Sequence, residues 1–292
     1  MAAMTGSVNR LHNELEGVVR PARGRRREGE PLHKVIAAWL ILILAMGYFL
    51  LPLLGTLLFS LKAQPFGQAW ADMINDSHLW SSLGYSFVIA VITILASTLL
   101  LVPTAFWVRL RVPRLRPVVE FVTLMPFVIP PIVLVYGLIQ TFSGPPFPFT
   151  ATNQGSDALL VCAYVVLSFP YMYRAIAAGL RTIDIRSLTE ASQSLGAGWP
   201  TTMWRVILPN LRVAILSGAF LTLAIVMGEF TVANFLARQS MFAVYLQQTS
   251  GNLAYQPAAV VLISFAMTWG AMGVIAWIGR GRTDKVKLTG AH

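Results

Sequence analysis

Six long apolar segments, separated by short polar connections, constrain this chain more than any other feature of its sequence. They lie at residues 35–60, 83–107, 118–142, 157–173, 207–229 and 258–279. A helix of about 20 apolar residues crosses a bilayer core of about 30 Å. Every backbone polar group in hydrocarbon needs an internal partner, so each such segment is expected to be helical. The sequence therefore predicts an all-α integral membrane protein with six transmembrane helices.

Composition supports a membrane protein and excludes several other classes. The chain is 56% hydrophobic and 12% charged, with a mean hydropathy of +0.65. Soluble domains are about 25% charged. The single cysteine, Cys162, excludes an internal disulfide framework and a multi-cysteine metal site. The first apolar segment is too long for a signal-peptide core and has no small-residue cleavage site after it, so we expect it to be retained.

Lys and Arg residues are distributed unevenly between the connections, and this distribution predicts the topology. Of the 22 Lys and Arg residues, all but Lys62 and Arg238 lie in the N-terminal region, the second and fourth connections or the C-terminal tail. Cytoplasmic connections carry the excess of positive charge. Both termini and the 174–212 connection are thus expected to be cytoplasmic. Because topology accounts for the net charge of +10, we predict no nucleic-acid partner.

These patterns divide the chain into three parts. Residues 1–33 are expected to form a flexible basic cytoplasmic tail that rests on anionic membrane lipid. Residues 34–282 form the transmembrane domain, and residues 283–292 a second cytoplasmic tail. On the outer side, the 143–156 connection is rich in Gly, Pro and Phe and suits a rigid cap. The 230–257 connection is long enough for a short re-entrant or interfacial helix around residues 240–249.

The fourth connection carries the most specific motif of the sequence, in residues 187–209. Helical spacing of Glu190, Ala191 and Leu195 predicts a short helix over 187–195. Glycines at 196 and 198 permit the positive φ that ends a helix. Pro200 suits the first turn of a second short helix. A polar helix-turn-helix between two membrane segments requires a partner or a lipid surface.

This stretch resembles the EAA loop of ABC importer permeases, the cytoplasmic loop that docks into the ATPase subunit. The family pattern is E-A-A, three residues, G, nine residues, then I-x-L-P. Five positions match in register: Glu190, Ala191, Gly196, Leu208 and Pro209. Ser192 replaces the second Ala and Val206 replaces the Ile. The runs GLRTID at 179–184 and GEF at 228–230 are similar to those of the polyamine, iron, thiamine, sulfate/molybdate and phosphonate branch.

The resemblance implies a type I ABC importer permease (MetI-like) fold in the inner membrane of a bacterial cell. Its implied partners are two ATP-binding-cassette ATPase subunits, a second permease that is a different chain, and a periplasmic or lipoprotein substrate-binding protein. The ATPase-docking residues that it implies are Glu190, Ala191, Ser192, Leu195, Gly196 and Pro209. The sequence has no Gly-rich phosphate loop with Lys and Ser/Thr. We therefore expect a transport subunit that is no enzyme and holds no cofactor, with ATP and Mg bound by the partner ATPase.

Five other residues are candidates for special roles within or beside the apolar segments. Glu229 ends the fifth segment, where it either lines the translocation pathway or is an interfacial residue bonded to backbone. Pro130 and Pro131 predict a bent third segment, which either faces the pathway or is a packing irregularity. Glu120 lies beside an Arg-rich connection and is expected to form a local ion pair, and Asp157 to cap the fourth helix.

The remaining residues offer no second chemistry, and they leave the substrate open. The four histidines are too scattered for a metal site. The run AVYLQQ at 243–248 is most similar to polyamine or aminophosphonate permeases, so a small polar solute such as spermidine or putrescine is expected. Iron(III), thiamine and sulfate are the alternative cargoes. An ATP-independent secondary transporter would require buried charges at mid-membrane, and segments one, two, four and six contain none. Besides the importer permease and the secondary transporter, a structural membrane protein that transports nothing is a third possible function.

Overall fold

The computed structural model describes residues 32–236 and 238–280, and all regular elements in these ranges are helical. The predicted tails therefore lie outside the described residues, apart from the first residues of α2. In chain order the helices are α2 (Leu32–Ser60), α3 (Gln68–Ile74), α4 (Ser77–Leu110), η1 (Pro113–Leu115), α5 (Arg116–Val128), α6 (Pro131–Phe142), η2 (Phe149–Ala151), α7 (Asn153–Thr182), α8 (Ile185–Ser194), α9 (Trp199–Thr202), η3 (Met203–Ile207), α10 (Leu208–Asn210), α11 (Arg212–Gly228), α12 (Thr231–Phe235), α13 (Phe242–Asn252) and α14 (Gln256–Arg280).

The apolar segments of the sequence become helices that can cross a membrane. In the described residues, α2, α4, α7 and α14 are each long and apolar enough to span one. Two bent pairs bring the number to six if each pair is one span. One pair joins η1 and α5 to α6 with a bend of 99°, and the other joins the α9–α10 region to α11 with a bend of 73°. The all-α membrane class is therefore confirmed, with four to six spans.

The bend in the third segment is located at the two prolines that predicted it. Helix α5 ends at Val128, and Pro130 is the N-cap of α6, with Pro131 at its first position. Pro lacks a backbone N–H and cannot continue a helix through its own ring, but it suits a first turn. The expected bent helix is confirmed. Whether it faces a pathway stays a prediction.

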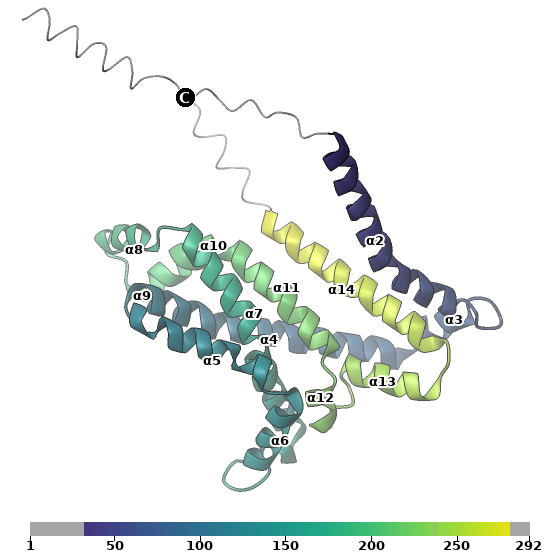
Figure 1. Ribbon diagram of the computed structural model, residues 1–292. Helices are drawn as coiled ribbons and strands as arrows, with labels where there is room; N and C mark the ends of the chain where they lie inside the picture. Colours follow the sequence, from purple (N-terminus) through teal and green to yellow (C-terminus); the bar gives the residue numbers. More distant parts are fainter. Residues whose placement is uncertain (1–31, 237, 281–292) are drawn as a thin grey trace, which may run out of the picture. The chain divides into compact units, whose positions relative to one another are not determined.

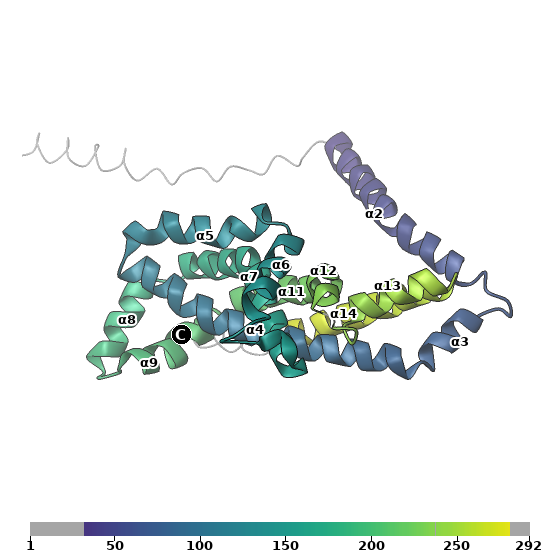
Figure 2. The same cartoon turned by 90° about the horizontal axis from the view of Figure 1, so that it is seen from below.

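The chain divides into two units, residues 1–54 and 55–292. The described part of the first unit is most of α2, in which residues 36–52 are exposed and nearly all apolar. In the second unit, α4, α7 and α11 lie side by side (Figure 1). Turned by 90°, the same unit shows α8 and α9 at one end of α4, and α3 and α13 at the other (Figure 2). The two ends of this helix bundle thus carry different elements.

Two clusters of buried side chains fill the second unit. The cluster toward α12 and α13 includes Leu79, Leu83, Tyr164, Val226 and Phe242. The cluster toward α8 and α9 contains Phe106, Met172, Ile176, Met203 and Ile207 among others. A buried hydrogen bond of 2.8 Å between the hydroxyls of Ser97 and Ser168 joins α4 to α7. The expected helix around residues 240–249 is confirmed as α13.

Helices α7 and α11 approach closely because small residues line their contact. A Cβ placed on Gly179 would lie 2.4 Å from Cβ of Ala214, which is a clash. A Cβ on Gly218 would lie 2.5 Å from Sδ of Met172. Small residues at helix contacts in membranes allow backbones to approach and gain dispersion energy. These two glycines therefore set the separation between α7 and α11.

Gly179→Val is expected to force α7 and α11 apart, because the added side chain overlaps Ala214. Overpacking of a close contact costs about 1–3 kcal/mol, which should lower the Tm of the purified protein in detergent. Gly270→Val is the matched control, since no atom lies within 4 Å of its Cβ position. Equal Tm values for the two variants would contradict this account of the α7–α11 contact.

Candidate functional site

The candidate docking loop, defined as residues 184–210, connects α7 to α11. It begins with a side-chain cap: the Asp184 carboxylate accepts hydrogen bonds from the Ser187 hydroxyl (2.7 Å) and the Ser187 backbone N–H (3.2 Å). These bonds hold the pKa of the Asp184 carboxyl below its usual value. The charged form is the one that best caps a helix start. Asp184 therefore fixes where α8 begins.

The predicted helix-turn-helix is confirmed. Helix α8 ends at Ser194, and Gly196 follows with φ of +79°. Only glycine adopts that conformation readily. Gly198 is the N-cap of α9, which carries Pro200 in its first turn. Gly196 thus has the positive φ that the sequence predicts, whereas Gly198 has φ of −72° and acts as an ordinary N-cap.

Polar and apolar contacts hold the docking loop to the rest of the bundle. The Ser192 hydroxyl, which is buried, lies 2.8 Å from the Thr202 hydroxyl and joins α8 to α9. Ile185, Met203 and Ile207 are buried in the cluster shared with α4 and α7. The residues Met203–Ile207 form a π-helical turn, a form that is common at functional sites. Ser192 therefore supports the loop from inside and does not belong to its outer surface.

The outer surface of the docking loop is formed by the other predicted residues. Leu195 is 88% exposed at the tip, which is unusual for a leucine. Ala191, Gly196 and Pro209 are also exposed. Glu190 accepts a hydrogen bond of 2.9 Å from Arg186 on the same helix, and both side chains remain largely exposed. The loop therefore presents an apolar tip beside a charged pair, with its inner side fixed.

The docking loop lies within the region that matches a known protein family. The model of the family described as "Binding-protein-dependent transport system inner membrane component" matches residues 101–280. This chain belongs to that family.

This permease is similar to transport proteins from several organisms. It is 24% identical to the putrescine transport system permease protein PotI of Escherichia coli, over 87% of this chain and 95% of the relative. It is 29% identical to a probable molybdenum ABC transporter permease protein of Haloferax volcanii, over 75% of this chain and 82% of the relative. A bacterial ABC transporter structure, involved in import of the acidic polysaccharide alginate, matches with a TM-score of 0.64 and 14% identity, covering 86% of this chain and 98% of that one. The permease fold is shared, whereas the cargoes of these relatives differ.

Glu229 lies between α11 and α12 in this permease, and its carboxylate is bonded to backbone. One oxygen accepts from the N–H of Thr231 and the other from the N–H of Val232, each at 2.9 Å. The Tyr164 hydroxyl donates to the Glu229 carbonyl at 3.3 Å. This geometry matches the interfacial alternative, in which Glu229 stabilises the start of α12. A role in the pathway stays a prediction.

The other two acidic candidates differ in outcome. Glu120 accepts a hydrogen bond of 2.8 Å from Arg116, so the local ion pair is confirmed. The expectation that Asp157 caps the fourth helix is wrong. Helix α7 begins earlier, and its N-cap is Thr152, whose hydroxyl accepts from the Gly155 N–H at 3.1 Å. Asp157 lies within α7 and is free to form a tertiary contact.

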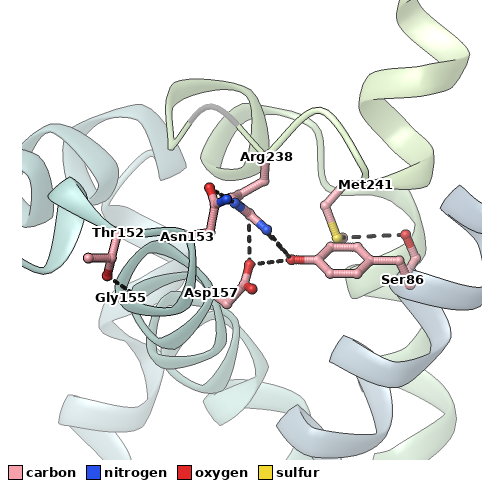
Figure 3. A network of polar contacts seen from close by, with 8 residues as sticks. Ser86, Thr152, Asn153, Gly155, Asp157, Arg238 and Met241 are labelled. Atoms are coloured by element: carbon pink, nitrogen blue, oxygen red, sulfur yellow. Dashed lines mark hydrogen bonds and ion pairs between the residues drawn. The ribbon is translucent and has the colours of Figure 1, made fainter.

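That tertiary contact is a polar network at the end of the bundle opposite the docking loop (Figure 3). Arg238, from the connection between α12 and α13, lies 2.7 Å from Asp157. Its guanidinium also donates to Asn153 Oδ1 and to the Tyr85 hydroxyl, both at 3.0 Å. The Tyr85 hydroxyl in turn donates to Asp157. The network therefore joins α4, α7 and the chain before α13.

Sequence reasoning did not find this network, although a signal existed. Arg238 is one of only two cations outside the regions assigned to the cytoplasm, and Asp157 is near the same side of the membrane. A charge that topology does not require needs another reason, and a partner of opposite sign supplies one.

In the described residues, no group of three or more His, Cys, Asp or Glu residues could hold a metal ion.

Arg238→Gln is expected to destabilise this end of the bundle, because it leaves the half-buried Asp157 carboxylate without its cation. Asp157 then keeps only the hydrogen bond from the Tyr85 hydroxyl, and the loss of a partner by a partly buried polar group costs about 1–3 kcal/mol. The double variant Arg238→Gln/Asp157→Asn removes both charges and should recover part of the lost stability in thermal unfolding. If the loss of stability in the double variant equals or exceeds the summed losses of the two single variants, the Arg238–Asp157 pair is not the stabilising contact.

Proposed function

We propose that this permease is one membrane subunit of an ATP-driven importer in a bacterial inner membrane. We assign it six spans, with each bent pair counted as one, and both ends of the chain in the cytoplasm. The observation that carries the proposal is the docking loop, which is held to the bundle on one side and exposes Leu195 on the other. The cleft of an ATPase subunit is the partner that would cover this tip. The ATPase pair holds ATP and Mg, and this chain contributes half of the translocation pathway.

The proposed mechanism follows from how the docking loop is attached. When two ATPases close around ATP, a loop seated in them moves with them. The Ser192–Thr202 bond and the buried Ile207 make α8, α9 and η3 move as one piece. That piece continues into α11, which packs closely on α7. Nucleotide would thereby select between two packings of the spans, one open outward and one open inward.

Two further partners complete the proposed importer. A second permease, which we assign to a different chain, supplies the other half of the pathway. A periplasmic or lipoprotein binding protein delivers the cargo to the outer face. The description of the family as a binding-protein-dependent transport system supports the binding protein.

Leu195→Asp should abolish ATP-dependent uptake, because a charge at the tip cannot enter an apolar partner surface. Membrane insertion and Tm should be unchanged, since Leu195 is 88% exposed. The measurement is uptake into proteoliposomes that hold the assembled importer. Leu253→Asp, an exposed leucine after α13, is the matched control and should transport normally. Full uptake by Leu195→Asp would reject the docking assignment, and uptake by the isolated chain without ATP would favour a secondary transporter.

For the cargo we propose a small polyamine such as putrescine or spermidine. An outer cavity of about 630 Å³ between α4 and α13 supports this proposal. Its lining includes the Asp76 carboxylate and the ring of Tyr245, and neither Lys nor Arg lines it. Tyr85 also lines it, but the Arg238 guanidinium already lies over the Tyr85 ring, 5.7 Å from its centroid. A carboxylate and aromatic faces attract ammonium groups. The Tyr245 hydroxyl donates to Asp76 at 2.6 Å, and burial together with this bond raises the pKa of Tyr245 to about 12. Asp76 is the one carboxylate among the residues that line this cavity.

Asp76→Asn should raise the KM for putrescine uptake several-fold, because it removes that charge and keeps an oxygen acceptor for the α4 cap. Asp72→Asn is the matched control: Asp72 binds Gln256 and does not line the cavity. Competition assays with molybdate, ferric ion and putrescine identify the cargo directly. If molybdate or iron(III) is the transported solute, or if both variants behave alike, the polyamine proposal is wrong.

A further inference from the structure

A cleft between α5 and α7, at the end of the bundle near the docking loop, has no role in the importer described above. It consists of two adjoining cavities of about 550 and 360 Å³. Both are lined by Glu120, Tyr173, Ala177 and Arg181, so they form one continuous space. Ala177, one of these shared residues, has a small side chain. The cleft is thus large enough for a polar group of several heavy atoms.

The cleft concentrates positive charge that has no partner within the protein. Four arginines line it: Arg109, Arg116, Arg174 and Arg181. Its one carboxylate, Glu120, is paired with Arg116. In the ranges that the structure describes, no carboxylate lies within 4 Å of Arg109, Arg174 or Arg181. Tyr173 lines both cavities, and among the described residues its hydroxyl forms no hydrogen bond with another side chain. Three guanidinium groups and one hydroxyl are therefore available to a ligand.

Membrane topology alone does not explain this arrangement. An excess of arginine at the cytoplasmic end is required of any such protein. Topology does not require arginines from α4, α5 and α7 to converge on one cavity. Arg114 serves as the comparison: it lies in the same connection as Arg116 and lines neither cavity. The convergence points to an anion with several acceptor oxygens, and phosphate matches the arginine fork in geometry.

The surface beyond the cleft is apolar, which favours an amphiphile over a free anion. One turn further along both helices, the rings of Phe127 and Tyr171 contact each other with centroids 5.3 Å apart. Phe121, Met125 and Val128 on α5 are exposed by 67%, 40% and 81%. An inorganic phosphate would use the arginines only. A phospholipid would use both surfaces, with its phosphate among the arginines and its acyl chains along α5.

We propose that the α5–α7 cleft binds the phosphate of an anionic phospholipid of the inner leaflet. Arg109 and Arg181, which line the same cavity, bind the phosphate oxygens, and the Tyr173 hydroxyl donates one further hydrogen bond. Basic pockets between membrane helices on the cytoplasmic side suit anionic headgroups. The placement in the inner leaflet rests on the topology proposed above. Because the cleft lies on α7, which continues into the docking loop, a bound lipid would brace the helix that bears this loop.

The test is lipid retention by the purified full-length chain, measured by native mass spectrometry after delipidation and addition of defined lipids. Dioleoylphosphatidylglycerol should bind at least tenfold more tightly than dioleoylphosphatidylcholine, which has the same chains and no net charge. Arg109→Gln/Arg181→Gln should lose this preference. Arg114→Gln/Arg205→Gln is the matched control, because it removes the same charge from exposed arginines that do not line the cleft. Equal loss in both double variants would overturn the proposal.

Two further arms keep the result interpretable. Tyr173→Phe removes only the hydroxyl, so it should weaken phosphatidylglycerol binding several-fold without lowering Tm, even if the arginine variant fails to fold. Inorganic phosphate should not displace the bound lipid at equal concentration, and if it does, the cleft is a free-anion site and the lipid proposal is wrong. Lipid retention is measured on the purified chain without its partners. A failure to retain phosphatidylglycerol therefore leaves the importer assignment intact. Conversely, Leu195→Asp should bind lipid normally even where it abolishes uptake.

Discussion

The close approach of α7 and α11 is the contact on which the rest of this structure depends. In hydrocarbon, helices gain little from the hydrophobic effect when they associate, so packing must come from close surfaces. Gly179 and Gly218 provide that closeness, since any larger residue there would overlap its neighbour. The docking loop is the connection between these two helices. Its position relative to the bundle is therefore set by the same contact that holds the bundle together.

The two ends of the bundle use charge in opposite ways. At the end with the docking loop, arginines are abundant and several lack a partner among the described residues, which is tolerable where water and lipid phosphates are within reach. At the other end, Arg238 is almost buried, and its guanidinium is matched by Asp157, Asn153 and Tyr85. A half-buried charge without such partners would be costly. The arginines near the docking loop can therefore bind groups outside the protein, whereas Arg238 at the opposite end is held by partners within it.

Local signals predicted the docking loop well because its conformation is decided locally. Gly196 has the positive φ that its position after a helix indicated, and Pro200 lies in the first turn of α9. The roles of individual side chains were less predictable. Ser192 replaces the second Ala of the family motif and faces inward to Thr202, and Asp157 proved to be an ion-pair partner rather than a cap. Such roles depend on residues distant in sequence, which no local pattern specifies.

The sequence by itself determined the membrane class, the helical segments, the bend at Pro130 and Pro131, and the form of the docking loop. Each of these follows from hydrophobic length, missing backbone donors or glycine conformation, all of which act within a few residues. Only the tertiary structure decided which charges meet. The network of Arg238 joins residues 85 and 153 positions apart, and the arginines of the α5–α7 cleft come from three helices. Long-range packing sets those distances, so the sequence pattern alone does not contain them.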